Sequence, residues 1–105
     1  MNSNMIKQVQ RMQADLEQAM KELQNTVFES VAGNVVHVAM TGDRKVVSVN
    51  FDDNFEAHDK DDLEMLQDMI VLACNDLYKQ IEDAENKMRE EKLGPYASLL
   101  QGIKF

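Results

Sequence analysis

The chain has 105 residues, the length of one ordinary domain, and its 44% hydrophobic and 29% charged residues are typical of a globular protein rather than a disordered one. It has no apolar run near the ~20 residues that a membrane span needs, and no stretch near its start resembles a secretory signal. The single cysteine, Cys74, cannot form an intrachain disulfide, and together with the missing signal this predicts a cytoplasmic protein. The length predicts one domain spanning residues 1–105.

The net charge of −8 argues, taken alone, against nucleic-acid binding, because phosphate contacts need lysine and arginine. The distribution of charge along the chain matters more than its sum. The acidic excess lies wholly in residues 26–78, which carry three basic and eleven acidic side chains, whereas the two ends of the chain are neutral.

Residues 4–24 are predicted to form a helix that ends near Asn25. Apolar side chains recur along it at alternating intervals of four and three residues, which is the narrow seam of a coiled coil. Good helix formers fill its other faces. The apolar positions are Met5, Val9, Met12, Leu16, Ala19 and Leu23.

Three short runs rich in β-branched residues follow and are predicted to be strands. The turn signals Gly33-Asn34 and Gly42-Asp43 separate them. Connections this short force neighbouring strands to be antiparallel, so the centre of this α+β chain is predicted to be a three-stranded meander. The expected strands span residues 26–32, 35–41 and 45–51.

A long helix is predicted over residues 61–93, with Asp59, Asp61 and Asp62 as N-cap and first-turn acids. Met65 and Met69 are expected in the core or in a dimer interface. The main apolar stripe comprises Leu63, Leu66, Ile70, Ala73, Leu77, Ile81, Ala84 and Met88, widened by Met65, Met69 and Leu72.

Gly94-Pro95 is expected to end this long helix. The remaining residues, 94–105, are expected to form an irregular tail that holds at most one short helical turn, around Ala97–Leu100.

The length of the second helix predicts a homodimer. A helix of about 33 residues is roughly 50 Å long, whereas a compact domain of this size has a radius of gyration near ~13 Å. The helix must therefore project beyond its own core, and its apolar stripe continues along the projection. A second copy of the chain is the simplest source of cover for that stripe.

No set of residues predicts catalysis, metal binding or a cofactor, so we expect a protein that is not an enzyme. Cys74 lies on the apolar side of the second helix and is expected to be a buried, inert thiol. His37 and His58 belong to no recognisable motif, and His37 is expected at a surface or interface. The acids after Asp52 do not match a calcium loop, because Ala57 stands where that loop requires glycine.

The distribution of cations is the most informative feature of the sequence. If the two helices pack antiparallel, the start of the first meets the end of the second, away from the sheet. Residues 1–12 and 86–105 together carry six basic and two acidic side chains, about +4 on a molecule that is −8 overall. These charges either make the helix ends soluble or bind a polyanion.

The order of elements resembles the YbaB/EbfC family of bacterial nucleoid-associated proteins over about residues 3–92. The most specific stretch is Asp59–Lys79, DKDDLEMLQDMIVLACNDLYK, with an acidic helix start, Glu-Met-Leu and a conspicuous Asn75. The hairpin VVHVAMTGDRKVVSVNFDD, Val35 to Asp53, and the Met/Gln-rich Met5–Gln13 are also similar. In the tail only Ile103-Lys104-Phe105 resembles the family's usual ending.

This resemblance implies a tweezer-shaped homodimer whose helical arms grip duplex DNA without strong sequence preference, and it implies no cofactor. The cations that match the family's arm tips are Lys7, Arg11, Lys87, Arg89 and Lys92. The alternative is an acidic dimeric protein-interaction module, which would hold a basic, unidentified protein partner without significant DNA binding.

Overall fold

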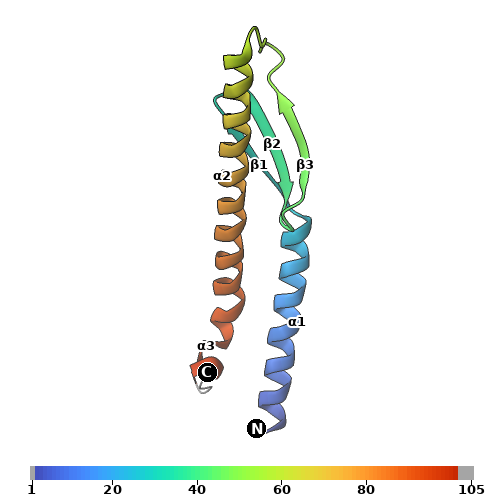
Figure 1. Ribbon diagram of the computed structural model, residues 1–105. Coiled ribbons are helices and arrows are strands. Elements are labelled where there is room, and N and C mark those ends of the chain that lie inside the picture. The colour runs from blue at the N-terminus through green and yellow to red at the C-terminus, as the bar shows by residue number, and fades with distance from the viewer. Residues whose placement is uncertain (1, 102–105) are drawn as a thin grey trace.

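The computed structural model describes residues 2–101, apart from the side chain of Leu100. The predicted order of a helix, three antiparallel strands and a long helix is confirmed, as Figure 1 shows. The elements are α1 (Ser3–Asn25), β1 (Val27–Ala32), β2 (Val36–Thr41), β3 (Val46–Phe51), α2 (Lys60–Leu93), the 3-10 turn η1 (Gly94–Tyr96) and α3 (Ala97–Gln101).

Side chains cap the first turn of each long helix. The Asn2 side chain accepts a hydrogen bond of 2.8 Å from the Met5 backbone N–H at the start of α1. The Asp59 side chain accepts one of 3.0 Å from the Asp62 N–H at the start of α2. Each cap satisfies a backbone donor that has no partner inside its helix, so the predicted capping role of Asp59 is confirmed.

The three strands form one sheet in the order β1-β2-β3, and α2 lies across one of its faces (Figure 1). Alternation along β2 turns Val36, Val38 and Met40 toward α2, where they are buried with Leu77 and Ile81. Because α2 packs mainly on β1 and β2, this core rests chiefly on two of the three strands.

Not every residue of the predicted apolar stripe is in this core. Leu63 and Leu72 are 52% and 56% exposed, and Met65 is also exposed, so these three side chains lie outside the core of a single copy of the chain. For Met65 the other expectation, a dimer interface, stays a prediction. Leu72 is five residues from Leu77, which places it on the opposite side of α2 from the sheet. Met69 does contribute, because it packs against the core beside Gly33 in the β1–β2 turn.

The irregular tail predicted after residue 93 is also wrong for the part that the structure describes. The chain continues from α2 through η1 into α3, so only the short turn expected around Ala97–Leu100 is confirmed. Gly94 has helical dihedral angles, φ −51° and ψ −48°, and Pro95 is well suited to the first turn of a new helix. The Gly-Pro pair therefore ends α2 without ending helical structure. Residues 102–105 lie outside the described part.

The molecule is long and thin. Its Cα radius of gyration is 20.2 Å and its extents are 70 × 22 × 15 Å, whereas a compact chain of this length has a radius near ~13 Å. The first half of α2 packs on the sheet, and the second half runs beside α1 beyond the sheet (Figure 1). The predicted projection of the long helix past its own core is therefore confirmed.

Candidate nucleic-acid interface

The start of α1 and the end of α2 lie together at the end of the molecule remote from the sheet (Figure 1). We call residues 3–15 and 86–96 the arm tip. The two helices run antiparallel, because α1 enters the sheet at Asn25 and α2 leaves it in the opposite direction. This arrangement brings residues that are more than 70 positions apart in the sequence to the same end of the molecule.

Apolar side chains join the two helices above the arm tip. Ala19 of α1 is buried. Close to Ala19 along α1, a cavity of about 300 Å³ lies between the helices. Leu16 and Met20 of α1 and Met88 and Leu93 of α2 line this cavity, together with Glu17 and Arg89. The contact between the helices is therefore apolar inside and charged at its rim.

A side-chain hydrogen bond also links the two helices at the arm tip. The Tyr96 hydroxyl, in the turn after α2, donates to Asp15 Oδ2 on α1 over 2.8 Å. This bond raises the pKa of Tyr96, because the phenol donates to a carboxylate, while the nearby Arg11 charge acts in the opposite direction. Arg11 therefore lies close to the end of α2. No pattern in the sequence predicts this contact between residues 81 positions apart.

All five cations predicted for the arm tip have exposed side chains. Lys7 and Arg11 are four residues apart and lie on one face of α1, and Arg89 and Lys92 are three apart and lie on one face of α2. Lys87 differs, because a separation of two residues places it about 160° around α2 from Arg89. The helices thus present two cationic pairs, and Lys87 points another way.

The acidic residues gather at the opposite end of the molecule. The loop of residues 52–59 and the first turns of α2 lie at the end of the molecule opposite to the arm tip in Figure 1. Residues 52–68 carry eight acids and one lysine, whereas the arm tip carries five basic and three acidic side chains. One of those three acids, Asp15, is already bonded to Tyr96. The long axis of the molecule is therefore also an axis of charge separation.

Two further polar contacts, neither predicted from the sequence, fix α2 on the sheet. The Ser30 hydroxyl of β1 donates to Asp76 of α2 over 2.7 Å, and this bond is the main reason that the pKa of Asp76 is lowered. At the other edge, Arg44 of the β2–β3 turn pairs with Glu85, which lowers the pKa of Glu85. Together they hold α2 to β1 and to the β2–β3 turn, and so set the direction of the arm.

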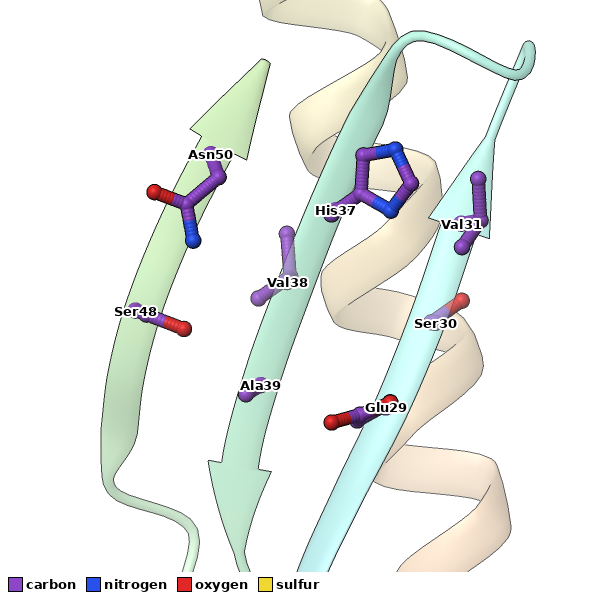
Figure 2. Close-up of a pocket in the computed structure, with 8 residues that line it drawn as sticks. All are labelled: Glu29, Ser30, Val31, His37, Val38, Ala39, Ser48 and Asn50. Atoms are coloured by element: carbon purple, nitrogen blue, oxygen red, sulfur yellow. The ribbon is translucent and has the colours of Figure 1, made fainter. Parts of the chain in front are cut away.

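The face of the sheet away from α2 has a shallow cavity of about 150 Å³ (Figure 2). Its exposed rim is polar, with His37 on β2 beside Asn50 on β3 and with Glu29 on β1. The surface position expected for His37 is confirmed. Within residues 2–101, no three or more histidine, cysteine, aspartate or glutamate side chains are grouped to hold a metal ion. No helix in this part of the chain is long and apolar enough to cross a membrane.

The family resemblance read from the sequence is confirmed by comparison with known proteins. The chain matches the model of the YbaB/EbfC DNA-binding family over residues 1–96. It is 36% identical over 101 residues to a nucleoid-associated protein of Ligilactobacillus salivarius, covering 95% of this chain and 91% of that protein. It is 41% identical over 98 residues to a nucleoid-associated protein of Streptococcus thermophilus, covering 92% and 93%.

The fold has a relative among solved structures as well. The crystal structure of an uncharacterized protein from Helicobacter pylori matches with a TM-score of 0.70 and 23% sequence identity, over 89% of this chain and 98% of that chain. At this identity the likeness concerns the fold alone, and the family assignment rests on the sequence matches. The chain belongs to the YbaB/EbfC DNA-binding family.

Proposed function

We propose that the chain is a nucleoid-associated protein of the bacterial cytoplasm that binds duplex DNA as a homodimer, with little sequence specificity, and alters the conformation of the DNA. The binding residues are cations of the arm tip: Lys7, Arg11, Lys87, Arg89 and Lys92. The single observation that carries this proposal is the charge separation along the molecule, in a chain of a DNA-binding family.

Contacts at the arm tip would be made to phosphates. Exposed lysine and arginine on helix surfaces attract the backbone of any duplex, and they read base edges only if a helix enters a groove. The acidic loop at the other end would be repelled by the same backbone. The molecule would therefore meet DNA with its arm tip first, and the pairs Lys7–Arg11 and Arg89–Lys92 would supply most of the attraction.

A mobility-shift titration at two salt concentrations tests this proposal. Replacing Lys7, Arg11 and Arg89 together with glutamine should abolish most of the affinity for duplexes of unrelated sequence. Each lost phosphate contact should also lower the log–log salt slope by about 0.9. The matched control replaces Lys21, Lys45 and Lys60, three exposed lysines outside the arm tip, and so removes the same formal charge.

The two triple variants separate local contacts from net charge. Near wild-type affinity in the control, with loss in the arm-tip variant, supports the proposal. Equal losses in both would mean that net charge alone governs binding. No binding by the wild type at low salt, or none lost in the arm-tip variant, would refute DNA binding at this site and leave the protein-interaction module as the function to test.

An uncovered apolar surface supports the homodimer. Val49 and Phe51 of β3 pair with Val38 and Val36, so they share the face that α2 covers on β2, yet both are exposed. Tyr78 of α2 lies near Arg44 of the β2–β3 turn, and its side chain is also exposed. Soluble monomers rarely leave a contiguous apolar surface of this kind open to water.

A second copy of the chain is the proposed cover. A two-fold axis parallel to the long axis would bring the two apolar surfaces together and leave both arm tips pointing the same way, as a pair of tweezers. Sedimentation equilibrium at micromolar concentration should give twice the chain mass of 12.0 kDa. A mass near that of one chain would refute the dimer.

A further inference from the structure

We infer that Tyr96 is a positioning residue, whose hydrogen bond to Asp15 fixes α1 to the end of α2 so that the cations of both helices meet DNA as one rigid unit. This inference rests on the proposed DNA binding at the arm tip. Tyr96 itself need not touch DNA in this role.

The position of the bond in the fold is the first reason. At the sheet end, α1 is held by backbone contacts: the Gly42 N–H donates to Thr26 O over 2.9 Å, just after the helix. Toward the tip, a cavity lies between α1 and α2, lined by Leu16, Met20, Met88 and Leu93. Among the described side chains of the two helices and η1, the Tyr96–Asp15 pair supplies the hydrogen bond that joins α1 to the end of α2.

The neighbours of the bond are the second reason. Asp15 is one helical turn from Arg11, and Arg11 lies close enough to Tyr96 for its charge to act on the phenol. Arg89 lies at the rim of the adjacent cavity with Glu17. The bond therefore sits between the cationic pair of α1 and the cationic pair of α2. If it is lost, the distance between the two pairs is no longer fixed.

A helix end that is fixed before binding loses less conformational freedom when it meets DNA. Tyr96→Phe keeps the aromatic ring and removes only the donor, so every cation remains. We expect affinity for duplex DNA to fall about two- to tenfold, the usual effect of one net intramolecular hydrogen bond. The log–log salt slope should stay unchanged, because no phosphate contact is lost.

Hydrogen exchange of the DNA-free protein gives a readout that is independent of DNA. In Tyr96→Phe, backbone amides of residues 5–15 should exchange faster than in the wild type. Asp15→Ala should have the same effect, and the double variant should show no further increase, since both changes break one bond. Asp15→Asn retains an acceptor oxygen and should restore slow exchange. Ser48→Ala, which removes a hydroxyl on the face of the sheet away from α2, is the control and should change neither exchange nor affinity.

Each contrary result has a distinct meaning. Wild-type exchange and affinity in Tyr96→Phe would overturn the inference, and so would faster exchange with unchanged affinity. A salt slope lower by about 0.9 in Tyr96→Phe would show that the hydroxyl contacts phosphate directly, which also overturns a positioning role. If the wild type bound no DNA, the proposed function would fail and the positioning role with it, while the exchange data would still report whether the bond holds α1.

Discussion

The Ser30 hydroxyl on β1 and the Asp76 carboxylate on α2 are 46 positions apart in the sequence and 2.7 Å apart in the structure. Gln80, one turn further along α2, donates to the same carboxylate oxygen over 2.7 Å and to the Glu29 carbonyl over 3.1 Å. This network connects the edge of the sheet to the middle of α2. Ile81 is buried in the core further along α2, so the network lies where the helix is still packed on the sheet.

Ser30→Ala should destabilise the fold. Ser30 is buried, and the substitution removes the hydrogen bond that the Asp76 carboxylate accepts from its hydroxyl. We expect a lower midpoint in thermal unfolding followed by circular dichroism. Ser48→Ala, on the opposite face of the sheet, is the control and should unfold at nearly the wild-type temperature. An unchanged midpoint in Ser30→Ala would mean that Gln80 alone is enough to hold Asp76.

Stability should fall at acid pH. Hydrogen bonds from Ser30, Thr41 and Arg44 lower the folded-state pKa of Asp76, Asp43 and Glu85, respectively. A carboxyl with a lowered folded pKa binds its proton more readily when unfolded, so its stabilisation is present above the unfolded value of about 4 and is lost as pH falls through the folded value. Unfolding midpoints measured from pH 7 to pH 2 should decline below about pH 4.

The same pH series has an internal check. Asp76→Asn removes one of the three titrating groups, so its midpoint should be lower than that of the wild type at pH 7 and should decline less steeply on acidification. A parallel decline in the two proteins would exclude Asp76 as a source of the acid sensitivity.

Gly42→Ala should destabilise the junction between α1 and the sheet. A Cβ at Gly42 would lie 1.9 Å from the backbone carbonyl oxygen of Leu23, so the backbone itself must move. We expect a loss of about 1–3 kcal/mol in the free energy of unfolding, measured with urea. Gly94→Ala is the matched control, because Gly94 has helical dihedral angles and open space around it. That variant should gain about 0.4–1 kcal/mol.

Cys74 should be a structural residue. It is half-buried and packs against the core formed by α2 and the sheet. Cys74→Ala should lower the free energy of unfolding by about 1 kcal/mol and leave DNA affinity unchanged. In the native wild-type protein, labelling of this thiol with a maleimide should be slow compared with the urea-unfolded chain. Rapid native labelling, or loss of DNA binding with the fold intact, would contradict this role.

Val49→Asp should convert the proposed dimer into monomers. The substitution places a charge on the uncovered apolar face of β3, which a second copy would have to desolvate. Val31→Asp is the control: Val31 is 53% exposed and Val49 42%, but Val31 lies on β1, at the opposite edge of the sheet. Light scattering after gel filtration should give the mass of one chain for Val49→Asp and of two for Val31→Asp. Identical masses would place the interface elsewhere.

The sequence predicts the elements of this fold well because their signals are local. The apolar spacing from Met5 to Leu23 gives α1, and the alternation of Val36, Val38 and Met40 gives the buried face of β2. Alternation does not say which strand a helix covers, so the exposure of Val49 could not be foreseen. Gly94-Pro95 ends α2 as expected, but the pair suits both the end of one helix and the start of another, so the helical continuation could not be foreseen.

The candidate site was only partly accessible from the sequence for the same reason. The cations could be chosen from charge counts and from antiparallel packing. Their relation to Asp15 and Tyr96 could not, because a bond that joins residues 81 positions apart leaves no periodic pattern. Likewise, nothing in the local sequence of Lys87 distinguishes it from Arg89, although helical geometry turns the two in nearly opposite directions.

The unbroken course of α2 makes it a lever. The turns at Leu77 and Ile81 are held against the sheet, and Leu93 lies about 24 Å from Leu77 along the helix. A tilt of α2 by about 5° at Leu77 would move Leu93 by about 2 Å. Substitutions in the core, at Val38 or Met40 for instance, can therefore shift the positions of the arm-tip cations without changing any of those residues.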